Sequence, residues 1–270
     1  MTQDIREILF QPVMARRFSA RLTTEREGVI AGVASAARKL AEIGIAPELL
    51  VREGQFVQCG EVIARFEGNP LQISLAEEQV IGQMAKFSGI ATAAHEAVRL
   101  SQGQCRIASG GLKKVPSEIR QEVRNAIVTG GASPRLLDVP FLYIDKNYVR
   151  VFGGIGKALE AASLLADRVP VIQLKGETGS IAEETREAVQ GGAGVIMVDT
   201  GEFADVEAAI RTLDEMGVRA QKKVAFAEDL KMEDIPRCLS LGVDLLCIGK
   251  EIIDAPLLDM KLDIMKESKN

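Results

Sequence analysis

The chain has 270 residues, a length that predicts one large α/β domain or two unequal domains. Hydrophobic residues make up 47% and charged residues 26%, which is typical of a globular protein and excludes a disordered or fibrous chain. A formal net charge of −5 argues against nucleic acid or an anionic membrane as the main partner, and the single histidine, His95, excludes a zinc site built on paired imidazoles.

The first residues of the sequence are not expected to form an export signal, because Asp4 and Glu7 stand where such a signal needs a basic start. No apolar run approaches the roughly 18 residues of a membrane span. The four cysteines are widely spaced, which favours free, mostly buried thiols over disulfides or metal ligands. We therefore expect a cytoplasmic protein.

Residues 1–103 are predicted to form a small α+β domain. The runs 27–32 and 53–64 alternate apolar residues with polar residues or glycine, which predicts antiparallel strands joined by tight turns. A helix is expected over 33–43, and a long one over 71–101 with an interruption near Ser88-Gly89. His95 falls in this helix, where a solvated or packing role is expected. The domain boundary is placed near Gly103.

Residues 104–270 show a different pattern, in which short apolar runs alternate with amphipathic helices. Strands are expected at 106–109, 141–144, 171–174, 195–198, 224–227 and 245–248. Strands that are apolar throughout and return through helices predict a parallel sheet covered by helices, and such units closing on themselves make a (β/α) barrel. The last helix is expected to return to the first domain.

The carboxyl ends of barrel strands carry the chemistry in such folds. The residues that follow the predicted strands are Ser109 to Lys114, Asp145 and Lys146, Lys175, Asp199 and Thr200, Glu228 and Asp229, and Gly249 and Lys250. A lysine among carboxylates at one rim forms either an ion-paired catalytic cluster or a structural ring of salt bridges. The rim position favours the catalytic interpretation for Lys175, Asp199 and Glu228.

Two glycine-led loops are candidate anion sites. Gly110-Gly111 precedes Lys113 and Lys114, and glycines let a backbone approach phosphate or carboxylate while lysines supply positive charge. A solvated lysine pair on a turn explains this loop equally well. Gly130-Gly131 precedes Arg135, whose guanidinium is suited to a carboxylate or phosphate.

Several segments together resemble one family, the quinolinate phosphoribosyltransferases, also called nicotinate-nucleotide pyrophosphorylases. The resemblance runs over most of the chain, and its most specific part is Ser88-Gly89-Ile90-Ala91-Thr92. Further segments are Gly28 to Gly32, Glu53 to Gly68, Pro116 to Arg120, Gly130-Gly131, Val195 to Asp199 and Leu258 to Asp263. The resemblance implies an α/β sandwich domain followed by an incomplete α/β barrel, the type II phosphoribosyltransferase architecture, in a homodimer or a multiple of dimers.

The family reaction joins quinolinate to phosphoribosyl pyrophosphate with Mg²⁺ and yields nicotinate mononucleotide, pyrophosphate and CO₂. Carried over by resemblance, Asp199 would stabilise the ribosyl cation or position Mg²⁺, and Lys175 would be a second catalytic residue. Lys113, Lys114 and Arg135 would bind the carboxylates, and Lys146, Lys175 and Lys250 would face phosphates or acidic partners. The expected substrate-binding positions also include Gly249, Glu78, Glu228 and Asp229.

Three acidic residues depart from the family pattern. Glu78 stands where the family has the arginine of a Glu-Arg pair, and Glu228 and Asp229 stand where it has a Ser-Gly-Gly phosphate loop. Acidic side chains there would repel a phosphate. Two hypotheses follow: a phosphoribosyltransferase-type enzyme acting on quinolinate or a related carboxylated ring, or a non-transferase homologue that binds another small anionic ligand.

Overall fold

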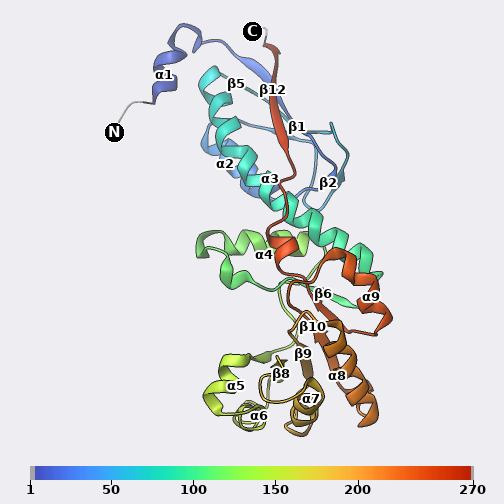
Figure 1. Ribbon diagram of the computed structural model, residues 1–270. Helices are drawn as coiled ribbons and strands as arrows, with labels where there is room; N and C mark the ends of the chain where they lie inside the picture. Colours follow the sequence, from blue (N-terminus) through green and yellow to red (C-terminus); the bar gives the residue numbers. More distant parts are fainter. Residues whose placement is uncertain (1–3, 269–270) are drawn as a thin grey trace. The chain divides into compact units, whose positions relative to one another are not determined.

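The computed structural model describes residues 4–268 (Figure 1). The chain forms two compact units: Met1–His95 with Val115–Gly131 and Ile252–Asn270, and Glu96–Lys114 with Ala132–Glu251. The sequence boundary near Gly103 differs from this division, because two later segments of the chain pack with the first unit. Contacts between segments so far apart in the sequence leave no local signal.

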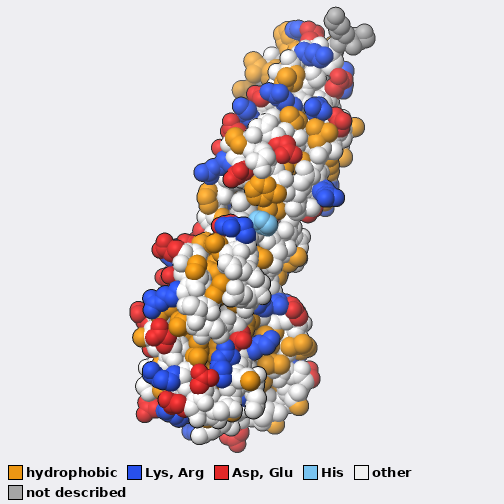
Figure 2. Space-filling view, turned by 90° about the vertical axis from the view of Figure 1, so that its right-hand side faces the viewer, with side chains coloured by type: hydrophobic (Ala, Val, Ile, Leu, Met, Phe, Trp, Pro, Cys, Tyr) orange, Lys and Arg blue, Asp and Glu red, His pale blue; other side chains and the backbone are white. Residues whose placement is uncertain are grey.

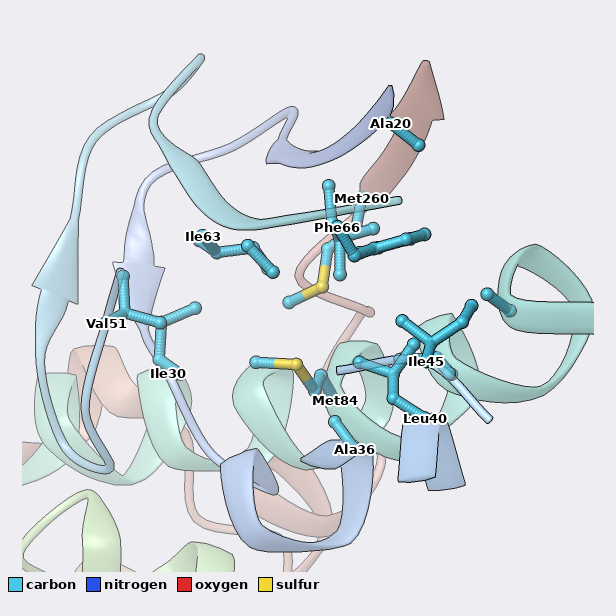
Figure 3. Packing of buried hydrophobic residues seen from close by; sticks show 14 of the residues in the cluster. Ala20, Ile30, Ala36, Leu40, Ile45, Val51, Ile63, Phe66, Met84 and Met260 are labelled. Atoms are coloured by element: carbon cyan, nitrogen blue, oxygen red, sulfur yellow. The ribbon is translucent and has the colours of Figure 1, made fainter. Parts of the chain in front are cut away.

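The first unit is built on a four-stranded antiparallel sheet with the strand order β12-β1-β5-β3. Its elements are α1 (Ile5–Leu9), η1 (Gln11–Val13), β1 (Phe18–Thr24), β2 (Gly28–Val29), α2 (Val33–Glu42), β3 (Glu48–Leu49), β4 (Phe56–Val57), β5 (Val62–Gly68), α3 (Pro70–Ser101), η3 (Ser117–Ile119), α4 (Arg120–Thr129) and β12 (Met260–Glu267). Its core lies between one face of the sheet and helices α2 and α3, where Leu40, Ile63, Phe66 and Met84 pack together (Figure 3).

The last segment of the chain returns to this unit as strand β12, whereas the sequence predicted a helix. Strand β12 pairs antiparallel with β1 along the whole length of β1, from Phe18 to Thr24. The alternation of Met260 and Leu262 toward the core with charged residues between them fits a half-buried strand. An edge of the sheet is therefore formed by residues about 240 positions away in sequence.

Helix α3 is continuous over Pro70–Ser101, so the interruption expected near Ser88-Gly89 is wrong. Glycine is required there for close packing, since a Cβ at Gly89 would lie 2.1 Å from the backbone oxygen of Pro256. The hydroxyl of Ser88 accepts from the Ala31 N–H at 2.9 Å, and that of Thr92 accepts from the Val29 N–H at 2.9 Å. The Ser-Gly-Ile-Ala-Thr motif thus binds the chain around β2 to α3.

The single histidine lies at the surface of this unit, pale blue in Figure 2. Its ring is 6.1 Å from that of Phe56, between centroids. His95 is therefore an exposed residue beside an aromatic ring, as the sequence predicted. On the face shown in Figure 2, acidic and basic side chains are interspersed.

The second unit is a six-stranded parallel sheet with the order β6-β11-β10-β9-β8-β7. Its elements are β6 (Arg106–Ala108), η2 (Leu112–Lys114), β7 (Phe141–Ile144), α5 (Lys146–Phe152), α6 (Ile155–Ala162), β8 (Val169–Leu174), α7 (Ile181–Gln190), β9 (Val195–Val198), α8 (Phe203–Glu215), η4 (Arg219–Gln221), β10 (Lys223–Phe226), η5 (Met232–Asp234), α9 (Ile235–Ser240) and β11 (Leu245–Cys247); α10 (Lys250–Ile253) begins here and ends in the first unit.

The sheet is curved and open, because β6 and β7 are its two edges and do not pair with each other. Its inner face is filled by Val171, Val195, Met197 and Leu245, with Leu136 and Leu137 packed against them. On the outer face Phe226 meets Phe203 of α8, with ring centroids 5.3 Å apart. The predicted incomplete (β/α) barrel, preceded by a smaller α+β domain, is confirmed.

All four cysteines are free. Cys105 and Cys238 are buried, as expected, whereas Cys247 is half-buried and Cys59 is exposed. Among residues 4–268, no helix has both the length and the apolar character that a membrane crossing requires.

Candidate functional site

Three side chains meet at the carboxyl ends of the adjacent strands β8, β9 and β10. Lys175 follows β8, Asp199 follows β9, and Glu228 lies two residues after β10. The strands are parallel and in register, with Leu174 beside Val198 and Val198 beside Phe226, so the residues after them share one edge of the sheet. We call the loops that follow β8, β9 and β10 the central rim.

An ion-paired cluster occupies the central rim. The Lys175 Nζ lies 2.6 Å from a carboxylate oxygen of Glu228 and 3.8 Å from one of Asp199. The side chains of Lys175 and Asp199 are 20% and 16% exposed, whereas that of Glu228 is 49% exposed. One ammonium group is therefore shared by a largely buried carboxylate and a half-exposed one.

The pKa values of the two carboxylates of the cluster are shifted in opposite directions. Burial raises the pKa of Asp199, and the nearby Glu228 charge adds to this, although the Lys175 charge and a hydrogen bond from Gln173 lower it in part. The hydrogen bond from Lys175 lowers the pKa of Glu228. Groups with environments that push their pKa values apart are typical of active sites. Asp199 thus combines low solvent exposure with a raised pKa.

Gln173 connects Asp199 to the neighbouring loop. The residue is 8% exposed, its amide nitrogen donates to the Asp199 carboxylate, and its amide oxygen accepts from the Lys146 backbone N–H at 2.7 Å. Lys146 is the first residue of α5, and its charge also lowers the pKa of Glu228. A single buried amide therefore orients the carboxylate and holds Lys146 beside the cluster.

The loop after β8 is shaped by a buried carboxylate. Glu184, which is 3% exposed, accepts from the backbone N–H groups of Lys175, Gly176 and Thr178 at 2.8–3.1 Å and from the Thr178 hydroxyl at 2.9 Å. These four bonds fix the backbone that carries Lys175. The position of the Lys175 backbone at the strand end is thus held by a buried carboxylate.

Two further residues bring polar atoms to the inner face of the sheet near the central rim. Burial raises the pKa of Tyr143, with Asp199 adding to the effect, and burial raises the pKa of Cys247 to about 12, again assisted by Asp199. Both groups are neutral near pH 7. The Cys247 thiol is consequently a poor nucleophile, since the thiolate is the reactive form.

Glu228 and Asp229 have left-handed backbone conformations, with φ of 81° and 49°. Such φ values favour glycine and are unfavourable for other residues. The carbonyl oxygen of Glu228 lies 2.9 Å from the position that a Cβ on Gly201 would take, so the loops after β9 and β10 are tightly packed. The loop keeps a glycine-type backbone while it presents two carboxylates.

The loops after β6 and β11 form the flanking rim. Gly249 lies against Gly110, since a Cβ at Gly249 would be 3.0 Å from the Gly110 oxygen. The lysines of these loops, Lys113, Lys114 and Lys250, have exposed side chains. Within residues 4–268 none of the three forms an ion pair or a side-chain hydrogen bond. The flanking rim thus offers positive charge without a fixed arrangement.

Arg135 lies over the first residue of β7, near the start of the sheet strands, and its expected role in binding carboxylates stays a prediction. Its guanidinium lies 5.6 Å from the ring centroid of Phe141, the first residue of β7. Arg135 also contributes, after Arg106, to lowering the pKa of Asp138. Arg106 is the first residue of β6, so these groups gather at the amino-terminal end of the sheet.

Glu78 belongs to the first unit, on α3. Its carboxylate pairs with the guanidinium of Arg6 from α1, which also binds Asp4. The acidic residue that replaces the arginine expected from the family is therefore accompanied by an arginine from another helix. Arg6 thus places a positive charge beside Glu78, although the two residues are 72 positions apart in the sequence.

The central rim does not fit a resident metal ion. Among the described residues no group of three or more His, Cys, Asp or Glu side chains could hold one. The two carboxylates that do approach each other, Asp199 and Glu228, are bridged by the ammonium of Lys175. The Lys175 ammonium thus occupies the place between the two carboxylates that a metal ion would need.

The sequence identified Lys175, Asp199, Glu228 and Lys146 as rim residues, and the structure brings these four together. It did not identify Gln173, Tyr143, Cys247 or Glu184. One feature of the sequence could have identified Gln173, since it is a polar amide within an otherwise apolar predicted strand. Glu184 had none, because it lies among other acidic residues on an amphipathic helix.

Comparison with known proteins gives a consistent result over both units. Residues 7–88 match the family described as quinolinate phosphoribosyl transferase, N-terminal domain, and residues 90–263 match its C-terminal domain. The chain is 24% identical over 251 residues to a probable nicotinate-nucleotide pyrophosphorylase [carboxylating] of Archaeoglobus fulgidus, covering 92% of this chain and 94% of the relative. It is 26% identical over 249 residues to a protein of the same name from Bacillus subtilis, covering 91% and 83%.

Solved structures agree with the fold. NadC from Streptococcus pyogenes superposes with a TM-score of 0.82 at 17% identity, covering 99% of this chain and 92% of that chain. A nicotinate-nucleotide pyrophosphorylase from Pyrococcus furiosus gives a TM-score of 0.81 at 20% identity, covering 97% and 74%. None of these relatives supports the alternative of a non-transferase homologue.

Proposed function

Because the chain belongs to the quinolinate phosphoribosyltransferase family, we propose that it transfers a phosphoribosyl group from phosphoribosyl pyrophosphate to quinolinate or a closely related carboxylated ring. In this reaction the ring nitrogen forms a bond to the anomeric carbon of the ribose as the bond to pyrophosphate breaks. With quinolinate, the carboxyl group next to the nitrogen then leaves as CO₂, and a proton takes its place. The product is nicotinate mononucleotide.

The observation that carries the proposal is the environment of Asp199. Positive charge develops at the anomeric carbon as pyrophosphate leaves, and a carboxylate held in place beside it stabilises that charge. Asp199 lies at a strand end, is 16% exposed on its side chain, and is oriented by Gln173. A fixed carboxylate in a poorly solvated position interacts more strongly with such a charge than an exposed one.

Lys175 and Lys146 supply the positive charge for the donor's phosphates. Lys175 is held by Glu228, whose half-exposed side chain is able to swing away when a phosphate takes its place. Lys113 and Lys114 on the flanking rim would attract the carboxylates of the ring. The ion pair between Lys175 and Glu228 must open during binding, so it lowers the affinity for the donor relative to a free lysine.

Magnesium enters this proposal only as the counter-ion of the donor's pyrophosphate, because the residues present do not fit a resident metal ion. Mg²⁺ commonly binds through substrate phosphates and keeps several waters. The proposal also includes a cytoplasmic location and a homodimer or a multiple of dimers. Light scattering of the purified chain would measure the oligomeric state.

The test is a turnover assay with the full chain, quinolinate, phosphoribosyl pyrophosphate and Mg²⁺. Release of pyrophosphate, with nicotinate mononucleotide identified by mass spectrometry, is the expected result, and an Asp199→Asn variant serves as the negative control. A parallel assay replaces quinolinate by other pyridine and pyrimidine carboxylates. If no ring acid gives pyrophosphate release and calorimetry detects no binding of phosphoribosyl pyrophosphate, the proposal is wrong.

A further inference from the structure

A hollow of about 280 Å³ lies on the first unit, and none of its lining residues belongs to the central or the flanking rim. Its lining comes from the end of β1, the turn before β5 and the start of β12: Arg21, Thr23, Thr24, Glu25, Cys59, Gly60 and Lys261. A single water needs only about 30 Å³. The hollow is thus large enough for a polyatomic ligand.

The strand register explains why donors gather there. Ala20 and Leu22 of β1 point into the core, so Arg21 and Thr23 lie on the opposite face of the sheet. In the pairing with β12, Thr23 lies directly opposite Lys261, and Arg21 lies two residues along. Directly opposite and diagonal neighbours on one face of a sheet are within contact range. A hydroxyl, a guanidinium and an ammonium therefore share one patch.

Two polar atoms of this patch are buried without a partner. The Thr23 side-chain oxygen and the Nε of Arg21 have no hydrogen-bond partner among residues 4–268, and Thr23 is only 5% exposed. Most buried polar groups in proteins are hydrogen-bonded, and an exception calls for an explanation. The Nε–H of arginine only donates, so the missing partner must be an acceptor.

The two cations of the patch are held loosely. The Arg21 Nη2 is 3.6 Å from Asp263, and the Lys261 Nζ is 3.7 Å from Glu25, distances longer than a hydrogen bond. Their side chains are 40% and 51% exposed. Neither cation is therefore fixed by a close partner, and each can turn toward a ligand.

We propose that this hollow is a binding site for a small phosphate-type oxyanion. Arg21 Nε–H and the Thr23 hydroxyl donate to its oxygens, and Lys261 supplies a second positive charge. The carboxylates of Glu25 and Asp263 at its edge disfavour a polyanion, so the ligand carries a single phosphate group. The site is separate from the central rim and does not depend on the proposed transferase activity.

The experiment is an amide NMR titration of the full chain with inorganic phosphate at constant ionic strength. Saturable shifts at residues 21–25, 59–60 and 261 are expected, and the Arg21→Gln and Lys261→Gln variants should weaken the binding at least tenfold. Lys266→Gln, on β12 outside the lining, is the matched control and should bind as the unmodified chain does. Glycerol 3-phosphate in a second arm identifies the source: tighter binding than inorganic phosphate indicates a phosphate monoester.

Thr23→Val separates binding from folding, because valine has the shape of threonine without the unpartnered hydroxyl. In phosphate-free buffer this variant should melt at or above the temperature of the unmodified chain. Added phosphate should raise the melting temperature of the unmodified chain by about 2–4 °C and that of the variant much less. An absence of saturable shifts with both phosphates, or equal shifts in the lining variants and in Lys266→Gln, would overturn the proposal.

Discussion

The central and flanking rims of the six-stranded sheet hold their charged groups in different ways. In the central rim, the Lys175 ammonium lies near the carboxylates of both Asp199 and Glu228, and the Gln173 amide donates a hydrogen bond to Asp199. In the flanking rim, Lys113, Lys114 and Lys250 are exposed, and none has a side-chain partner within the described residues. In the proposed reaction, the central rim would take part in the chemical step and the flanking rim would attract the substrate.

This contrast has an energetic basis. Orienting groups before a reaction removes the cost of arranging them during it, and a partly buried carboxylate acts through a lower effective dielectric than an exposed one. Exposed lysines act mainly through long-range attraction, which salt screens. Substitutions in the central rim should therefore change the chemical step, and those in the flanking rim should change substrate capture.

The largest effect is expected for Asp199→Asn, which removes the carboxylate and keeps the shape. The turnover rate should fall about 10²- to 10³-fold, because the charge that stabilises the developing cation is lost. Burial raises the pKa of Asp199, so its ionised form disfavours the folded state, and the variant should melt at or above the temperature of the unmodified chain. Asp214→Asn, on the exposed face of α8, is the matched control for both measurements.

The next effect concerns the pH profile of kcat/KM. Since the pKa of Asp199 is raised, activity should fall on acidification at a higher pH than an ordinary aspartate would cause. Lys175→Gln removes a charge that lowers this pKa, and Gln173→Leu removes a hydrogen bond that does so. Both variants should move the acid limb to higher pH, by about half a unit or more.

Gln173→Leu is the sharper of the two variants, since it leaves the charge of the site unchanged. For the Lys175→Gln variant, Lys157→Gln on α6 is the control, because it removes a lysine outside the central rim. An acid limb that stays in place in both central-rim variants would show that another group controls the profile.

A smaller effect is expected when Glu228 and Asp229 are both replaced by glycine. Affinity for phosphoribosyl pyrophosphate should rise about three- to tenfold, because two negative charges leave the loop and Lys175 is freed. Stability should stay within about 1 kcal/mol, because glycine suits the left-handed backbone at both positions. Calorimetry measures the affinity, and unchanged binding would mean that the two side chains face away from the ligand.

The matched control replaces Glu207 and Asp214 of helix α8 by glycine. Helix interiors disfavour glycine by about 1 kcal/mol per residue, so this variant should lose stability where the loop variant does not. Chemical denaturation of both variants provides the comparison.

The smallest effect is expected for Lys113→Gln with Lys114→Gln in the flanking rim. KM for the ring acid should rise about two- to fivefold with kcat unchanged, and the difference should disappear at high salt. Steady-state kinetics at two ionic strengths test this. A large fall in the kcat of this double variant would contradict the expectation that the flanking rim acts in substrate capture and not in the chemical step.

The strands of the second unit were predictable to within about two residues. Two of them, Phe141–Ile144 and Val195–Val198, have the predicted bounds, since each is a short apolar run with breaks on both sides. The positions of Lys175 and Asp199 followed directly, because a residue after a parallel strand lies at the carboxyl end of the sheet. Local pattern was sufficient for these features.

Other features were not predictable, because they depend on contacts between distant segments. Gly89 lies inside the continuous helix α3 and leaves room for the backbone of Pro256, and the last segment forms a strand that pairs with β1. Arg135 follows a glycine-led loop as an anion site would, yet it lies over Phe141. Gln173 and Tyr143 are polar residues inside apolar strands, and their roles depend on which face of the sheet they occupy.

The sequence alone therefore determined the order of the elements, the parallel sheet and the residues that reach its carboxyl edge, since periodicity and chain direction are local properties. The tertiary structure decided which of those residues are partners, which carboxylate is buried, and where the unpartnered donors of Arg21 and Thr23 lie. Pairing energies and pKa values arise from atoms brought together across many tens of residues, and no local pattern encodes those distances.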